Sequence, residues 1–485
     1  MFETCARREA AVLISNAAQD TAPGQLKKNQ AVQGQLLYLT IHDGGEQWVL
    51  RNAADSSLLP LDKKIFKAPK KDKDGKEFQS GTKIGMTCDI DTDGVCAPSD
   101  GSDVTVLGSA PVALTTSGST TITTTTTTGT TATTTATATA PINQRLLVMI
   151  MDYSICGFAP GLNESAIRSI FLGPTGNGAG GVAQKYTQCS YGKFNINATA
   201  FRVVTVPQNC STTVTASCAS WAISNGADTA AKAMLGATVF AGFTHYTYIL
   251  PPGLASRCTW AGLATIGGNQ TWLQTSSYGV NRWATVMQET LHNYGLWHSW
   301  RNGVEYEDYS TAMGRGDACP NAAETSRMGW ATPASGGGAI NTTVLTSAGV
   351  PRSYVLPASY ITGNGNYLRV VPNWLPSYTN YQTAKNLYID VRVAKLGDAA
   401  LGTAYAPMVN IHEVNATMDN GLPTSYANSD RKIQVIGMIA SLARVNLTAY
   451  NLVVYGGSWA TTDNMRVHLC RFATSPSHCK DVVGL

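Results

Sequence analysis

The pattern of hydrophobic and polar positions differs between three parts of the chain. Residues 30–52, QAVQGQLLYLTIHDGGEQWVLRN, alternate between apolar and polar positions around a Gly-Gly pair, which predicts a small β-rich domain over 30–114. After residue 140, QRLLVMIMDYSICG contains a continuous apolar run typical of a buried strand, and NESAIRSIFLG has helical spacing. Further strand-like runs and a second predicted helix over 283–294 indicate an α/β or α+β domain over 141–332, and we expect α+β.

From residue 333 to 485 the helical pattern nearly disappears. Short apolar runs such as RSYVLPASYI, NYLRVVPNW and NLYIDVRVAKLG are bounded by Gly, Pro or Asn. This pattern predicts an all-β, sandwich-like C-terminal domain.

Between the first two domains, residues 115–139 read TTSGSTTITTTTTTGTTATTTATAT. Such a segment has almost no apolar surface to bury, so we expect an extended linker over 115–140. We expect residues 1–29 to form a poorly structured N-terminus.

Composition excludes two classes of protein. The net charge is only +4 and charged residues make up 14% of the 485 positions, which argues against a nucleic-acid-binding protein. No apolar run approaches the ~20 residues that span a bilayer.

The cysteines and glycosylation sequons favour the secretory pathway. Three cysteine pairs are close in sequence and are interpreted as local disulfides: Cys88 with Cys96, Cys210 with Cys218, and Cys470 with Cys479. The six cysteines from 156 to 319 could also form three bridges among themselves. Seven N-x-S/T sequons all follow residue 160. The first twenty residues are charged, and their apolar run AAVLI is too short for the core of a signal peptide, so we identify no clear signal sequence.

The candidate chemistry lies in VMQETLHNYGLWHSW, residues 286–300. On a helix, Gln288 and His292 lie on one face, and Glu289 reaches a water bound to an ion that these two hold. Gly295 then allows a sharp turn that returns His298 to the same ion. The spacing therefore predicts a metal site with Gln288, His292 and His298 as ligands. The alternative is that both histidines are ordinary polar residues of an amphipathic helix.

A stripe of apolar residues at helical spacing would fix this helix in a core and hold the ligands still. It consists of Ala284, Met287, Leu291 and Tyr294.

The pattern E-x-x-H-x-x-G-x-x-H resembles the metzincin signature, with glutamine in place of the first histidine. Downstream, DYSTAMG supplies a candidate Met-turn at Met313, fifteen residues after His298, and CPNAAETSRMGW follows. Together these motifs resemble the gametolysin family of green algae, including the volvocine matrix metalloproteases. Glutamine is accepted at this position in that family. The resemblance implies a metzincin-like zincin catalytic domain, built of a twisted mixed sheet plus helices.

The resemblance also implies a function. By this resemblance the protein would be a metalloendopeptidase. It would use zinc, or copper, with Glu289 as general base and Met313 beneath the metal. Its substrates would be hydroxyproline-rich glycoproteins of the cell wall or extracellular matrix, and the protein would be secreted. The strand AGLATIGG, residues 261–268, would lie along the substrate peptide, and the segment before the Thr-rich linker would be a pro-region. A cysteine switch by Cys88 or Cys96 is disfavoured, because their spacing suits a disulfide.

The main alternative is a catalytically inactive matrix or adhesion glycoprotein that retains a protease fold, with Gln288 as the inactivating change. Retention of Glu289 argues against this alternative, because a decayed site has no need of its base.

Overall fold

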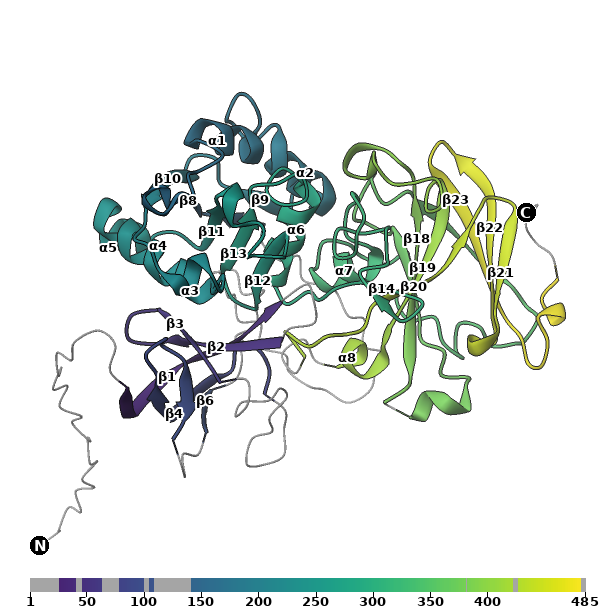
Figure 1. Cartoon of the computed structure of the whole chain (residues 1–485). Helices are drawn as coiled ribbons and strands as arrows, with labels where there is room; N and C mark the ends of the chain where they lie inside the picture. Colours follow the sequence, from purple (N-terminus) through teal and green to yellow (C-terminus); the bar gives the residue numbers. More distant parts are fainter. Residues whose placement is uncertain are drawn as a thin grey trace, which may run out of the picture.

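The computed structural model describes residues 26–40, 46–62, 78–99, 104–108, 141–380, 382–421 and 426–480. Statements below concern these ranges. The Thr-rich linker, nearly all of the predicted N-terminal tail and the lysine-rich stretch before residue 78 lie outside them. Figure 1 shows a small β unit, a sheet covered by helices and a C-terminal β region, which confirms the mixed α+β architecture.

The N-terminal unit is a set of antiparallel strands around its own core. Its long first strand β1 pairs with β4 through its first half and with β2 through its second half. Gly34 lies where the two pairings overlap, and a Cβ there would be 2.0 Å from the carbonyl oxygen of Arg51, so only glycine fits. The strands are β1 (Lys27–Thr40), β2 (Glu46–Asn52), β3 (Leu58–Pro60), β4 (Lys83–Ile90), β5 (Cys96–Pro98) and β6 (Thr105–Gly108).

The central sheet has the order β10-β8-β11-β13-β12. Its first four strands are parallel, and β12 runs antiparallel to β13 at the edge. The apolar run at 146–151 is buried on both faces of β8, as expected for an internal parallel strand. The strands are β8 (Leu146–Asp152), β10 (Arg202–Pro207), β11 (His245–Leu250), β12 (Gly262–Ile266) and β13 (Gln270–Gln274).

Helices cover both faces of this sheet. Alternate residues of β8 enter two different cores: Val148 and Ile150 pack with α1 (Glu164–Leu172), α2 (Gly181–Ser190) and α6 (Trp283–His292). Met149 and Met151 face the opposite core, which contains α4 (Ser220–Leu235) and apolar residues of β1. The remaining short elements are β7 (Ile142–Gln144), β9 (Phe194–Ile196), α3 (Thr212–Thr215), α5 (Ala237–Ala241) and α7 (Ala322–Arg327).

The C-terminal region consists of a six-stranded and a four-stranded sheet that share one apolar core. Besides strands it contains the short helix α8 (Ala416–Asn420). Two short strands, β14 (Trp300–Arg301) and β15 (Val304–Glu305), precede residue 332 and still belong to the six-stranded sheet. The other strands are β16 (Arg352–Pro357), β17 (Tyr367–Val370), β18 (Lys385–Arg392), β19 (Met408–Asn415), β20 (Gln434–Ile439), β21 (Ala443–Leu447), β22 (Leu452–Thr461) and β23 (Asn464–Arg471).

Five disulfides link the cysteines of the described ranges. Cys88–Cys96 and Cys470–Cys479 are confirmed as local bridges. The expected Cys210–Cys218 pair is wrong: Cys210 bonds Cys156 and Cys218 bonds Cys258. The reason is that β8 and β10 are adjacent and parallel, so Cys156 and Cys210, which follow these strands, meet at one end of the sheet.

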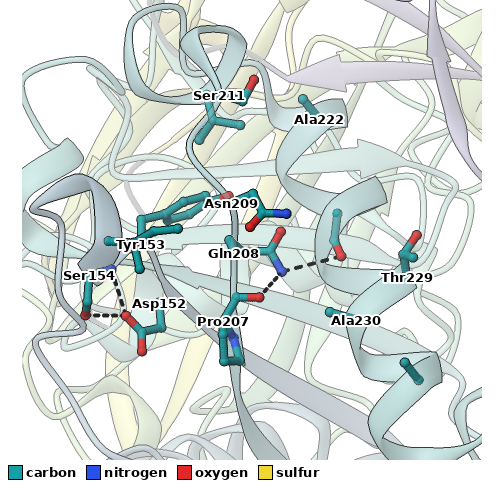
Figure 2. Close-up of a pocket in the computed structure, with 14 residues that line it drawn as sticks. Asp152, Tyr153, Ser154, Pro207, Gln208, Asn209, Ser211, Ala222, Thr229 and Ala230 are labelled. Atoms are coloured by element: carbon teal, nitrogen blue, oxygen red, sulfur yellow. Dashed lines mark hydrogen bonds between the residues drawn. The ribbon is translucent and has the colours of Figure 1, made fainter. Parts of the chain in front are cut away.

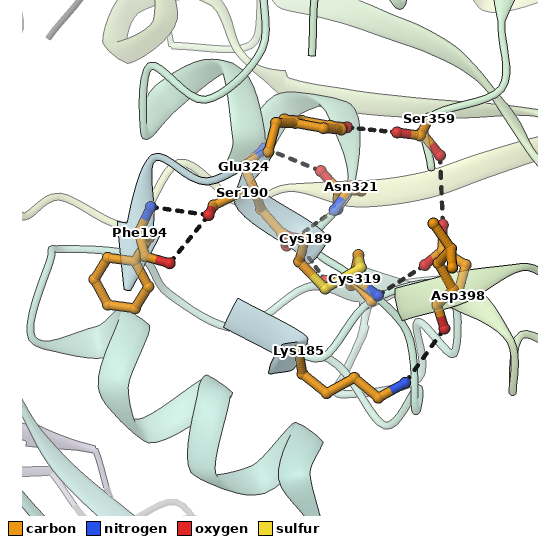
Figure 3. The surroundings of a disulfide bond; sticks show 12 residues. Lys185, Cys189, Ser190, Phe194, Cys319, Asn321, Glu324, Ser359 and Asp398 are labelled. Carbon is orange, nitrogen blue, oxygen red and sulfur yellow. Dashed lines mark hydrogen bonds between the residues drawn. A yellow bond between two sulfur atoms is a disulfide. The ribbon is translucent and has the colours of Figure 1, made fainter. Parts of the chain in front are cut away.

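The fifth disulfide, Cys189–Cys319, lies where the helical layer meets the C-terminal region (Figure 3). Asp398 Oδ1 accepts the backbone N–H of Cys319, and the buried Arg392 bonds both Asp398 and the carbonyl oxygen of Cys319. A Cβ on Gly397 would lie 2.3 Å from Cys319 Sγ, so this loop packs directly on the bridge. The disulfide therefore joins α2 to the loop of Cys319, and Arg392 of β18 and Asp398 hold that loop on the C-terminal region.

Candidate metal centre

Helix α6 carries the candidate ligands and is buried from Ala284 to His292. The predicted apolar stripe is confirmed, because Ala284, Met287, Leu291 and Tyr294 all lie in the core of the helical face. The chain turns at Gly295, whose φ of 81° and close approach to Ala427 and Asn428 both require glycine.

The two histidines of the pattern come together, as the spacing predicts. The ring centroids of His292 and His298 are 4.7 Å apart and the rings are perpendicular. Nδ1 of His292 is 2.7 Å from the carbonyl oxygen of Leu296, and Nδ1 of His298 is 2.9 Å from Glu305 Oε1. An oxygen acceptor at Nδ1 places the proton there and gives Nε2 the lone pair that a metal needs.

Gln288 lies one turn before His292 on the same helix. Its side chain is buried, and its Nε2 has no hydrogen-bond partner within the described part of the chain. The amide nitrogen has no lone pair for a metal, so Gln288 could ligate an ion only through Oε1, and the unbonded Nε2 shows only that the protein does not satisfy every polar atom of this buried amide. No cluster of three or more His, Cys, Asp or Glu with metal-ligand geometry exists among the described residues. The candidate donor set is instead two imidazoles and one amide, which fits a borderline ion such as zinc.

Glu289 lies directly against the edge strand β12. A Cβ built on Gly262 would be 2.6 Å from both Cγ and Oε1 of Glu289. Glycine at the first position of β12 therefore leaves the space that the carboxylate occupies.

Met313 is fully buried in the same core as α6. Its carbonyl oxygen accepts the backbone N–H of Ser299 at 2.9 Å, so the turn lies against the residue that follows His298. The structure thus places the predicted Met-turn beside the histidine loop.

The surroundings of His298 also contain residues that the sequence pattern does not single out. Besides Glu305, the ring of Tyr306 lies 4.0 Å from the His298 ring, measured between centroids. Glu305 ends β15 and Tyr306 follows it directly, so the hairpin of β14 and β15 brings both residues back to His298. Their proximity depends on this turn, and no ligand-like spacing in the sequence signals it.

The outer edge of β12, where AGLATIGG was expected to meet a substrate, is paired with β1. Tyr38 and Leu39 are in antiparallel register with Ile266 and Thr265. The hydroxyl of Thr40 bonds the carbonyl oxygen of Ala264 at 3.3 Å, which continues the contact toward Gly262. The N-terminal unit and the central sheet are consequently one continuous sheet.

A separate pocket of about 660 Å³ lies at the carboxyl ends of β8 and β10, against α4 (Figure 2). It is lined mainly by small and neutral residues, with Asp152 as its charged group and Gln208 bonded to the carbonyl of Pro207. None of the candidate catalytic residues lines it, and β10 is at the opposite edge of the sheet from β12. This pocket is not the candidate metal centre.

Comparison with known proteins matches residues 145–449 to the gametolysin peptidase M11 family. The chain belongs to this family. Membership indicates a metallopeptidase and implies a metal cofactor, typically zinc.

Among curated proteins, autolysin of Chlamydomonas reinhardtii is 38% identical over 95 residues, which cover 18% of this chain and 15% of autolysin. The similarity thus spans a small part of that relative. No solved structure matches the chain. The disulfides indicate an oxidising, extracellular environment, and within the described ranges no helix is long and apolar enough to cross a membrane.

Proposed function

We propose that this protein is a metal-dependent endopeptidase with a metzincin-type catalytic domain over residues 141–332. The observation that carries the proposal is the orientation of His292 and His298. Each imidazole has an oxygen acceptor at Nδ1, and the two rings converge at 4.7 Å. The antiparallel edge strand β12 beside α6 supports the same assignment.

Gln288, His292 and His298 would hold the ion. A bound zinc ion would lower the pKa of a water and polarise the scissile carbonyl. Glu289, pressed against Gly262, takes the proton of the attacking water on its carboxylate and delivers it to the leaving amine. Met313 lies in the core behind the histidine loop and bonds through its backbone, which suits a supporting role.

An amide oxygen at the first ligand position changes the metal preference. It is neutral like imidazole, but it is a weaker donor to zinc. Zinc is therefore held less tightly than by three histidines, and copper becomes a competitor at this site.

For the substrate, the family resemblance favours hydroxyproline-rich glycoproteins of a cell wall or extracellular matrix, reached by secretion. A catalytically inactive matrix or adhesion glycoprotein is the weaker alternative, because Glu289 and both imidazole orientations are retained.

We further propose that the N-terminal unit, residues 30–114, is a pro-region that acts by strand addition. A peptide substrate that extends β12 needs the edge that Tyr38 and Leu39 occupy. The Tyr38 ring also packs against Trp297, next to His298, with the centroids 5.0 Å apart and the rings tilted by 34°. Gln288, Glu289, His292 and His298 are all less than 5% exposed. The intact chain is therefore latent, and its activity appears once the N-terminal unit leaves.

The test uses the full chain with a specific protease site placed in the 115–139 linker. Metal content and peptide hydrolysis are measured before cleavage, after cleavage, and after the N-terminal piece is removed, beside a Glu289→Ala control. Metal-dependent hydrolysis after removal of the N-terminal piece, together with its absence in Glu289→Ala, would support the proposed peptidase activity. Equal rates in all three forms refute the pro-region, whereas no hydrolysis despite bound metal favours the inactive glycoprotein.

A further inference from the structure

A buried polar cluster joins the C-terminal sheet to the Met-turn segment. Asp308 Oδ2 accepts the hydroxyl of Ser299 at 2.7 Å, and Oδ1 accepts the hydroxyl of Ser310 at 2.6 Å. His412, on β19 of the C-terminal sheet, donates from Nε2 to Asp308 Oδ2 at 3.2 Å and lies 3.1 Å from the Ser310 hydroxyl. All four side chains are completely buried.

This cluster connects directly to the loop that carries His298. Ser299 follows His298 in the chain, and its backbone N–H bonds the carbonyl oxygen of Met313. Asp308 thus holds Ser299 through the side chain while Met313 holds it through the backbone. If Asp308 shifted, Ser299 would shift with it, and so would the backbone next to the candidate ligand His298.

The C-terminal sheet also contacts the loop that carries His298 at a second place. The N–H of Trp300 bonds the carbonyl oxygen of Ile433, and β14 continues as a parallel neighbour of β20. The loop that carries His298 therefore contacts α6 and Met313 on one side and the C-terminal sheet on the other.

Charge explains why His412 is needed at Asp308. Burial alone would raise the pKa of Asp308, but the hydrogen bonds from His412, Ser310 and Ser299 lower it, so the carboxylate stays charged. A buried charge without such partners is strongly disfavoured, so the carboxylate would move or take up a proton. Among these donors, His412 is the one that comes from the C-terminal sheet.

We infer that His412 is a positioning residue of the metal centre, which fixes Asp308 and through Ser299 sets the loop that carries His298. The inference rests on the proposed metal site. His412 acts at a distance and does not touch the reacting atoms. Its role makes the C-terminal sheet a structural component of the metal centre.

The test is zinc affinity of the full chain, measured with zinc alone in competition with a chromophoric chelator. His412→Leu removes the donor, while His412→Gln keeps an N–H close to the position of Nε2. Loss of a group bonded directly to a metal ligand typically weakens metal binding about 10- to 100-fold. His412 acts through Asp308 and Ser299, so we expect a loss of about tenfold for His412→Leu, the lower end of that range. The Gln variant should bind within about threefold of the wild type, because its amide restores the bond to Asp308.

Two further variants distinguish a positioning role of His412 from a general loss of protein stability. Asp419→Asn perturbs another polar cluster of the C-terminal region, a half-buried one in which Asp419 bonds Arg369, Asn386 and Tyr388, and it should lower stability without changing zinc affinity. Ser299→Ala removes one hydroxyl and provides a milder test if His412→Leu does not fold. It should weaken zinc binding in the same direction.

Wild-type zinc affinity in folded His412→Leu or in Ser299→Ala would overturn the inference while leaving the metal site intact. Failure of the wild type to bind zinc would instead remove the proposed function on which the inference rests. Equal losses in His412→Leu and Asp419→Asn would also refute it, since the effect would then be one of stability.

Discussion

Gly262→Ala is the substitution that tests most directly where Glu289 acts. The added Cβ would lie 2.6 Å from Glu289 Cγ and Oε1, whereas ordinary contacts begin at 3.4 Å. The carboxylate must therefore retreat by about 0.8 Å or rotate away from β12. The change introduces no new charge, and Gly262 stays in register with Leu273.

The expected loss follows from this displacement. A misplacement of about 1 Å in a catalytic group costs on the order of 100-fold in rate, or about 2.7 kcal/mol of transition-state stabilisation. We expect kcat/KM for peptide hydrolysis to fall by about this factor, approaching the loss in Glu289→Ala. Zinc affinity should stay within about threefold, because Glu289 is assigned as the base and not as a ligand.

The assay compares both variants with the wild type after linker cleavage and removal of the N-terminal unit. Gly437→Ala is the matched control, since the same methyl group on β20 meets no atom closer than 3.4 Å. Hydrolysis at the wild-type rate in folded Gly262→Ala would refute the assignment, because the position of Glu289 against β12 would then be irrelevant to turnover.

Three other substitutions test the ligand, a buried carboxyl and the disulfide at the C-terminal junction. Gln288→His should raise zinc affinity at least tenfold in chelator competition, because imidazole is the stronger donor. Burial raises the pKa of Glu324 from 4.5 to about 7, so its contribution to stability is complete below pH 4.5 and is lost as the pH rises through 7. Glu324→Gln does not titrate and should therefore gain up to about 3 kcal/mol over the wild type between pH 5 and 8 in denaturant unfolding, and a pH-independent difference would contradict this. Cys189→Ser removes the bridge to Cys319, which closes a loop of 130 residues, and should lower the free energy of unfolding by about 5 kcal/mol in the same measurement. An unchanged free energy of unfolding would show that the bridge does not form in the wild type.

The sequence was informative where function imposes local spacing. The helix over 283–294 and the convergence of His292 with His298 follow from helical periodicity and a glycine turn, and the structure shows both. Short spacing also predicted two of the three local disulfides correctly, but it failed for Cys210 and Cys218, which are eight residues apart like Cys88 and Cys96. Cys156–Cys210 was not predictable, because these cysteines are 54 residues apart and meet only because β8 and β10 are neighbours.

What the sequence could not reveal are contacts between segments far apart in the chain. The pairing of β1 with β12 joins positions more than 220 residues apart. The bond between Asp308 and His412 spans 104 residues, and neither residue belongs to a recognisable ligand pattern. Hydrophobic periodicity shows which face of a strand is buried, but it does not show which distant strand is the neighbour, and that is set by the packing of whole sheets.

These long-range contacts share one consequence for the catalytic centre. Its motif lies within residues 288–313, but the parts that control it come from both ends of the chain. The N-terminal unit covers the edge strand on which a substrate would extend, through Tyr38 and Leu39. The C-terminal sheet fixes the Met-turn segment through His412. A fragment cut at the ends of the motif-bearing domain would gain access to β12 and at the same time lose the support of His298. We therefore expect removal of the N-terminal unit to activate the proposed peptidase, and loss of the C-terminal sheet to inactivate it.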